Sequence, residues 1–159
     1  MPITLEPIGY VRGGRATPTD DDWGRSLARI ELDAGAFTPD ALAGLGDFSH
    51  IEVVYFFDRI DPAEVETGAR RPRGRADWPL VGIFAQRGRT RPNRLGVSVC
   101  RVLGVNGLAI EVEGLDAIDG TPVLDIKPVI KGFLPRGLLR EPKWAAEIMH
   151  DYWRAESKE

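Results

Sequence analysis

The chain of 159 residues contains one cysteine, Cys100, and only two histidines. A single thiol excludes an internal disulfide and any zinc or iron–sulfur site built from several cysteines, and so few histidines argue against a dedicated metal centre. The longest unbroken apolar run, Val53 to Phe57, is far shorter than the roughly 20 residues that span a bilayer. Because the sequence also begins without a secretion signal, we expect a reducing, cytoplasmic setting, with no metal and no membrane partner.

Signatures of nucleotide-binding and hydrolytic enzymes are also missing. No Gly-Lys-Ser or Gly-Lys-Thr occurs, which excludes a P-loop, and there is no nucleophile elbow or paired-histidine helix. Gly44-Leu45-Gly46 has Ser49 where a dinucleotide fingerprint requires its third glycine, and no βαβ pattern surrounds it. A Rossmann fold and a hydrolase are therefore disfavoured.

What the sequence does contain is a large number of turn-forming residues, 18 glycines and 12 prolines. Short alternating or β-branched runs lie between these turns and predict antiparallel strands. Asn106-Gly107, between two such runs, is a strong hairpin signal because both turn positions need positive φ. The strands that we expect cover residues 3–12, 26–32, 51–57, 80–86, 97–105, 108–112 and 123–130.

Such strands leave no exposed edges when they close on themselves, so we predict a mostly β fold, a small antiparallel β-barrel with one short helix and a C-terminal helix. One domain should cover residues 1–159, with the barrel over about 3–130 and the helical extension over about 141–156. The short helix is expected at Pro39 to Leu45.

The remaining segments have weaker signals. Pro142, followed by Trp144, Ile148 and Tyr152 at four-residue spacing, predicts the amphipathic C-terminal helix. Asp58 to Pro79, with its prolines and little periodicity, is expected to be a long loop. Pro128 indicates that the strand over 123–130 lies at a sheet edge.

Positive charge gathers in one stretch of a chain whose formal net charge is −3. Arginine binds phosphate or carboxylate through two parallel hydrogen bonds, so this stretch predicts anion recognition. A solvated face, or arginines paired with acids elsewhere, would explain it equally well. Between residues 70 and 101 there is one acid, Asp77, and nine arginines: Arg70, Arg71, Arg73, Arg75, Arg87, Arg89, Arg91, Arg94 and Arg101.

Two stretches have a distinctive order of residues. Phe84 to Ser98 opens into a basic turn and returns at once to a strand, which concentrates hydrogen-bond donors at a strand end. In the second stretch, Leu115 to Pro128, strand alternation places Asp125 and Lys127 on one face. This pair is either part of a site or a surface ion pair, and we favour the ion pair. Asp125, Lys127 and Asn93 are weak candidates for catalytic residues, and the sequence identifies no stronger one.

Both stretches closely resemble signatures of the TsaA-like, or TrmO-type, family of S-adenosylmethionine-dependent methyltransferases. Pro7 to Arg12, Phe-Ser-His at residues 48–50, and Asp-Gly-Thr-Pro-Val-Leu-Asp-Ile-Lys-Pro at residues 119–128 are similar to that family as well. The resemblance covers most of residues 5–130. It implies a small β-barrel, a homodimer, S-adenosylmethionine as cofactor, and methyl transfer to the exocyclic amine of a modified adenosine beside a tRNA anticodon.

The resemblance also implies site residues, position by position. The cofactor contacts are expected at Trp23, Asp58, Arg59, Phe84, Ala85, Gln86, Arg87, Val97, Glu113, Gly114, Leu115 and Asp116. The concentration of arginines, rather than the resemblance, leads us to expect substrate RNA at Arg70, Arg71, Arg73, Arg75, Arg91, Asn93 and Arg94. Trp23 is expected either to cover the cofactor or to cap the barrel.

S-adenosylmethionine carries an already activated methyl group, so a protein that binds it needs neither a metal nor a covalent nucleophile.

Three functions stay open. The family blocks and the arginines favour a tRNA adenosine methyltransferase. Gln86 and Arg94, which replace a threonine and a proline common in the family, favour a methyltransferase for a small molecule or a protein. A non-enzymatic RNA-binding barrel is weakened because aromatics do not alternate with the arginines as base-stacking platforms would.

Overall fold

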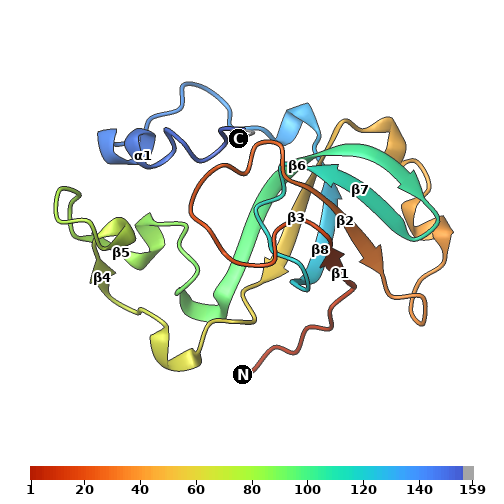
Figure 1. Ribbon diagram of the computed structural model, residues 1–159, viewed down its shortest axis with the longest axis horizontal. Helices are drawn as coiled ribbons and strands as arrows, with labels where there is room; N and C mark the ends of the chain where they lie inside the picture. Colours follow the sequence, from red (N-terminus) through yellow and green to blue (C-terminus); the bar gives the residue numbers. More distant parts are fainter. Residues whose placement is uncertain (156–159) are drawn as a thin grey trace.

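The computed structural model describes residues 1–155, and in it six antiparallel strands close into a barrel (Figure 1). This confirms the predicted mostly β fold. β8 pairs with both β3 and β1, which completes the ring. In order around the barrel the strands are β1 (Gly9–Arg12), β2 (Leu27–Leu32), β7 (Ala109–Glu113), β6 (Leu95–Asn106), β3 (His50–Phe56) and β8 (Pro122–Pro128).

The alternating pattern of the strands builds the core of the barrel. Val11 on β1 lies opposite Ile30 on β2, and Ile30 lies opposite Ile110 on β7, and all three side chains are fully buried. A register shift of one residue would turn each of them to the solvent, so the hydrophobic pattern determines the pairing. The predicted hairpin between β6 and β7 is confirmed, but its turn is shifted by one residue: Asn106 still belongs to β6 and pairs with Ala109, and of the two predicted turn residues only Gly107 has positive φ, 60°.

The predicted strand over residues 80–86 is wrong. Only Val81–Gly82 form a strand, β5, which pairs with β4 (Ala69–Arg70) outside the barrel. A 3₁₀ turn follows at Ile83–Ala85. Each of the six barrel strands already pairs on both sides, so this apolar run has no barrel strand left to pair with. Of its large apolar side chains, Ile83 is buried, whereas Leu80 and Phe84 are exposed.

Residues 58–94 form an arm between β3 and β6, to the left of the barrel in Figure 1. The long loop expected at residues 58–79 has more structure than predicted, because it contains β4 and 3₁₀ turns at Pro62–Glu64 and Pro72–Gly74. The arm lies beside the C-terminal helix, α1 (Lys143–Ile148), where the Trp78 indole donates a hydrogen bond to Glu147 at 2.8 Å.

The predicted limits of two strands, and the predicted edge position of one of them, are wrong. β1 begins at Gly9 rather than at residue 3. β8 is not an edge strand, since it has neighbours on both sides, and it ends at Pro128 rather than at residue 130. Proline is accommodated at the end of β8 because the next residue supplies the hydrogen bond to β3: the Val129 amide donates to the His50 carbonyl at 3.0 Å.

The helices are shorter than predicted. Instead of the helix predicted at residues 39–45, residues 39–47 form two 3₁₀ turns, Pro39–Leu42 and Leu45–Asp47, separated by Ala43 and by Gly44 at a φ of 84°. α1 has only six residues, so Tyr152 lies in the turns that follow it rather than on a helix face. Residue 156, the expected end of the extension, lies outside the described residues. Within the described part of the chain, no helix is both long and apolar enough to cross a membrane.

Candidate functional site

Asp116 lies three residues beyond the end of β7 and joins three distant parts of the chain. The Tyr55 hydroxyl, from the inward face of β3, donates a hydrogen bond to Asp116 Oδ1 at 3.0 Å. The Tyr152 hydroxyl, from the turns after α1, donates one to Asp116 Oδ2. We call these three residues the Asp116 cluster. Each carboxylate oxygen is therefore held by one phenol.

Both phenols of this cluster stay protonated at neutral pH. Burial, and then the adjacent Asp116 carboxylate, raise the pKa of Tyr55 and the pKa of Tyr152 far above the ordinary tyrosine value. A carboxylate has about four acceptor positions, of which the two phenols occupy two. Asp116 can therefore still accept hydrogen bonds from a bound molecule.

A guanidinium group lies next to the cluster. Arg87 donates a hydrogen bond to the Val97 carbonyl on β6 at 2.6 Å. The neighbouring Gly96 packs so tightly on Tyr55 that an added Cβ would lie 2.5 Å from the ring. The positive charge of Arg87 partly opposes the rise in pKa of Tyr55 and Tyr152. A carbonyl orients a guanidinium without neutralising it, so Arg87 keeps its positive charge near the cluster.

A cleft of about 260 Å³ adjoins the cluster. Its lining includes Gly114, two residues before Asp116, and Trp153, which follows Tyr152, so the cleft and the cluster are neighbours. Burial and then the Asp116 carboxylate raise the pKa of Cys100, another lining residue, to about 12. The lining residues are Gly24, His50, Val99, Cys100, Arg101, Glu113, Gly114 and Trp153. Glu113 is paired with Arg101 at 3.1 Å. Among residues 1–155, no three His, Cys, Asp or Glu side chains gather as metal ligands.

Residues 147–154, which we call the C-terminal strap, close one side of this cleft. The amides of Asp22 and Trp23 donate hydrogen bonds to the carbonyls of Asp151 and Tyr152 at 3.1 and 2.8 Å. At Gly24 an added Cβ would lie 1.9 Å from the Trp153 carbonyl oxygen, so only glycine permits this approach. Trp23 itself is buried beneath these contacts. Its position favours the capping interpretation over a free surface for a ligand.

The structure connects about half of the expected cofactor residues. Trp23, Arg87, Val97, Gly114 and Asp116 are linked through the contacts just described, and Glu113 lines the cleft. The Leu115 side chain is almost fully buried and belongs to the core. Within residues 1–155, no hydrogen bond or ion pair joins the cluster to the other expected residues, which are Asp58, Arg59, Phe84, Ala85 and Gln86.

Those other residues have different surroundings. Arg59 donates a hydrogen bond to the Ala16 carbonyl at 3.2 Å, and Asp58, Phe84 and Ala85 are exposed. The buried Gln86 amide donates to two carbonyls of the arm, at 2.9 and 3.0 Å. Gln86 therefore stabilises the fold of the arm.

Sequence reasoning missed the two tyrosines of the cluster. A signal for Tyr55 was present, because it occupies an inward-facing position of β3, and a buried tyrosine hydroxyl normally finds a partner. Tyr152 gave no such signal. Its spacing from Trp144 and Ile148 suggested a packing residue on a helix face.

Most arginines of the arm are oriented by groups that carry no charge. Arg70 donates to the Thr90 hydroxyl at 2.8 Å, and its Nε is buried without a partner in the described part of the chain. The carbonyl-bound arginines are Arg71 on Trp78, Arg91 on Gln86 and Arg94 on Ile60, at 2.5, 2.6 and 2.5 Å. Such bonds fix the side chains and leave their positive charge uncompensated.

Only some of these arginines pair with acids. Arg73 pairs with Asp21 at 3.0 Å, and Arg75 pairs with Asp77 at 2.5 Å. Arg89 is exposed and has no hydrogen bond or ion pair to any of residues 1–155. Pairing with acids therefore explains Arg73 and Arg75 but not Arg89 or the carbonyl-bound arginines, for which anion recognition stays a prediction.

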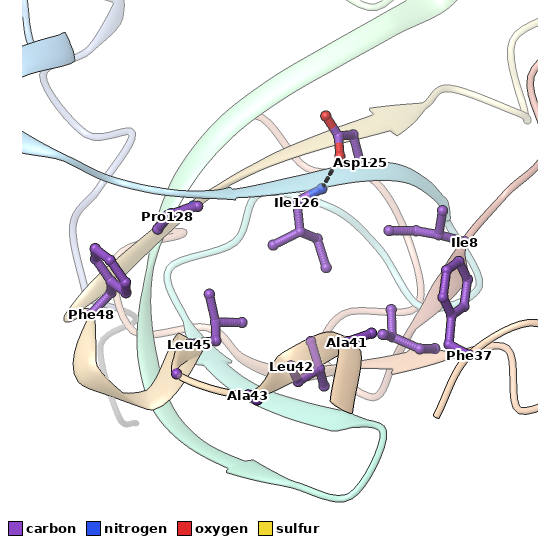
Figure 2. A pocket seen from close by; sticks show the side chains of 12 residues that line it. Ile8, Phe37, Ala41, Leu42, Ala43, Leu45, Phe48, Asp125, Ile126 and Pro128 are labelled. Atoms are coloured by element: carbon purple, nitrogen blue, oxygen red, sulfur yellow. Dashed lines mark hydrogen bonds between the residues drawn. The ribbon is translucent and has the colours of Figure 1, made fainter. Parts of the chain in front are cut away.

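The weak catalytic candidates lie elsewhere. Lys127 Nζ and Asp125 Oδ2 form the favoured ion pair at 2.6 Å, and the other Asp125 oxygen accepts from the Ile126 amide at 2.9 Å (Figure 2). Asp125 is the one charged residue lining an otherwise apolar pocket of about 460 Å³, which does not include Asp116. Asn93 occupies a turn with a φ of 63°.

Comparison with known proteins identifies the fold and its relatives. The family model of the tRNA-methyltransferase O N-terminal domain matches residues 13–133. A crystal structure of TrmO from Pseudomonas aeruginosa superimposes with a TM-score of 0.73 at 27% sequence identity, covering 91% of this chain and 62% of that one.

Two curated relatives differ in how much of their length is matched. A probable S-adenosyl-L-methionine-binding protein of Methanothermobacter thermautotrophicus is 35% identical over 133 residues, 80% of this chain and 90% of the relative. The tRNA (adenine(37)-N6)-methyltransferase of Homo sapiens is 32% identical over 135 residues, 80% of this chain but 30% of the relative. The chain thus spans about a third of the mammalian relatives that it matches.

Proposed function

Because this chain belongs to the family of the tRNA-methyltransferase O N-terminal domain, we propose that it binds S-adenosylmethionine at the Asp116 cluster and methylates the exocyclic amine of a modified adenosine next to a tRNA anticodon. One observation carries the proposal: Tyr55 and Tyr152 hold Asp116 beside the cleft that Gly114 and Trp153 line, and the Arg87 guanidinium is near enough to act on both phenols. The named activities of the relatives support the same conclusion.

The chemistry of these residues suits the cofactor. S-adenosylmethionine has a carboxylate, an ammonium group and ribose hydroxyls, and it supplies a methyl group activated by a sulfonium. The Arg87 guanidinium is a matched partner for the carboxylate. The free acceptor positions of Asp116 suit the ammonium or a hydroxyl. With these groups held, the protein has to align the acceptor amine with the methyl group, and the proton that the amine loses passes to solvent.

The arm provides the complementary surface for the acceptor. Arg70, Arg71, Arg91 and Arg94 keep their positive charge because their partners are a hydroxyl and carbonyls. Phosphate contacts from such side chains position a nucleic acid on its protein. We propose that these arginines hold the anticodon stem-loop while the target base reaches the cleft.

Calorimetric titration with S-adenosylmethionine tests the cofactor site. We expect Arg87→Ala to weaken binding more than about tenfold, which corresponds to roughly 1.5 kcal/mol for a charge-assisted hydrogen bond. Arg89→Ala is the matched control, because Arg89 is two residues away in the same turn and has no partner within the described residues. Equal affinity in the two variants would contradict the assignment of Arg87 to the cofactor site.

Incubation with labelled cofactor and total tRNA tests the acceptor. Label in tRNA at the adenosine beside the anticodon is the expected result. Cofactor binding without label in suitably modified tRNA would contradict the RNA assignment and favour a small-molecule or protein acceptor. Absence of cofactor binding would favour the RNA-binding barrel.

The salt dependence of tRNA binding distinguishes arginines whose charge is uncompensated from arginines that pair with an acid. Arg71→Ala should reduce the slope of log affinity against log salt by about 0.7 to 0.9, the value for one phosphate contact, because only carbonyls hold that guanidinium. Arg75→Ala should change it less, because Asp77 already pairs with that guanidinium. Filter binding over a range of salt concentrations measures both slopes. Equal changes would contradict the assignment of uncompensated charge.

We also propose that the protein is a homodimer in a cytoplasmic setting. Support for the dimer comes from the outward face of β6, where Val97, Val99 and Leu103 are exposed large apolar side chains. Support for the setting comes from the single buried thiol of Cys100. Light scattering after gel filtration measures the mass, and a monomer at about 10 µM would contradict the dimer.

A further inference from the structure

The C-terminal strap lies beyond residue 133, where the match to the family model ends, and yet it reaches the Asp116 cluster. The arm and the loop between β1 and β2 both hold the strap. The arm contributes the bond from Trp78 to Glu147 at 2.8 Å. The loop between β1 and β2 contributes the amides of Asp22 and Trp23, and the Asp22 carboxylate pairs with Arg154 at 2.8 Å. The strap is therefore a built part of this fold.

The strap places two aromatic side chains against the site. The Tyr152 hydroxyl donates to one oxygen of Asp116 while Tyr55 donates to the other. Tyr152 packs edge-on against Trp153, with ring centroids 4.8 Å apart, and Trp153 forms a wall of the cleft. Without the strap, one carboxylate oxygen of Asp116 would lose its partner and the cleft would lose this wall.

We propose that Tyr152 is a positioning residue for the Asp116 carboxylate, so that the strap completes the cofactor site from outside the part that the family model describes. The inference rests on the proposed function, because it assigns Asp116 to S-adenosylmethionine. The same strap also contacts the arm, through the hydrogen bond from Trp78 to Glu147.

A role in packing alone would not require the hydroxyl. Phenylalanine fills nearly the same volume as tyrosine, so Tyr152→Phe keeps the ring contact with Trp153 and removes only the hydrogen bond. Asp116 would then be held by Tyr55 alone and would sample other rotamers, and the ligand would have to fix it on binding. The loss should therefore appear in cofactor affinity and in the KM for the cofactor, while kcat changes little.

Calorimetric titration of the full chain with S-adenosylmethionine tests this inference. We expect Tyr152→Phe to bind about tenfold more weakly than the wild type, the lower range for loss of a hydrogen bond to a charged group. Tyr10→Phe is the matched control, because Tyr10 is an exposed tyrosine on β1 with no contact to Asp116. In an Asp116→Asn background, Tyr152→Phe should cause no comparable further loss. Thermal unfolding by circular dichroism verifies that each variant is folded.

The outcomes separate the two proposals. No binding by the wild type would overturn the proposed function, and this inference with it. Binding by the wild type with unchanged affinity in folded Tyr152→Phe would overturn the inference and leave the proposed function standing. An equal tenfold loss in the wild-type and Asp116→Asn backgrounds would show that Tyr152 does not act through Asp116, which also overturns the inference.

Discussion

Alanine at Gly24 is expected to detach the C-terminal strap while the barrel stays folded. The new Cβ would lie 1.9 Å from the Trp153 carbonyl oxygen, a backbone atom that a side-chain rotation cannot move away. The strap should move while the barrel stays intact, for two reasons. Only a few hydrogen bonds and an ion pair hold the strap, and Gly24 itself lies outside the barrel core. Cofactor affinity should fall at least as far as in Tyr152→Phe.

Amide hydrogen exchange measures this detachment directly. The amides of Asp22 and Trp23, which donate to the strap, should exchange more than about tenfold faster in Gly24→Ala, whereas the amides of β2 and β7 should keep their protection. Gly46→Ala is the control, because an alanine Cβ there meets no atom within 4 Å. Unchanged protection at Trp23 would show that the barrel and the strap adjust together.

Alkaline pH should destabilise the protein steeply. The pKa of Cys100 is raised from 9.0 to about 12, and those of Tyr55 and Tyr152 are raised above 10.0, in each case chiefly by burial. The native state keeps these protons while the unfolded chain releases them, so the free energy of unfolding falls above pH 9 by about 1.4 kcal/mol per pH unit for each titrating group. Cys100 acts from pH 9 and the tyrosines from pH 10.

The three groups together would remove about 5 kcal/mol by pH 11, comparable with the whole stability of a small domain. Urea unfolding at intervals from pH 8 to pH 11 measures this loss. Tyr55→Phe should flatten the dependence above pH 10, and Cys100→Ala should flatten it from pH 9 onward. A free energy of unfolding that stays constant over this range would contradict the assignment of buried protonated groups.

The barrel was predictable because its strands follow simple alternation. Ala28, Ile30 and Leu32 point inward while Arg29 and Glu31 point outward, and the turn at Gly107 determines one hairpin. The arm was not predictable in detail. Its run over residues 80–86 is as apolar as a strand, but closure of the other six strands leaves it no partner, and sequence periodicity carries no information about that closure.

Only the part of the site that lies in local sequence patterns was predictable. Arg87 and Asp116 lie within the distinctive stretches, and the charge of Arg87 acts on both tyrosines that hold Asp116, while their assignment to the cofactor stays a prediction. Tyr152 lies outside both stretches, and it reaches Asp116 only because Gly24 lets the strap approach the barrel. A tertiary contact between residues so far apart in sequence leaves no local pattern.

The carbonyl-bound arginines of the arm have a consequence for binding kinetics and thermodynamics. A flexible arginine loses rotamer entropy when a phosphate immobilises it, and this loss weakens association. Arg71, Arg91 and Arg94 are already restricted by the carbonyls of Trp78, Gln86 and Ile60, so that loss occurs during folding. A polyanion therefore meets a preorganised array of cations, and its capture should require little rearrangement of the arm.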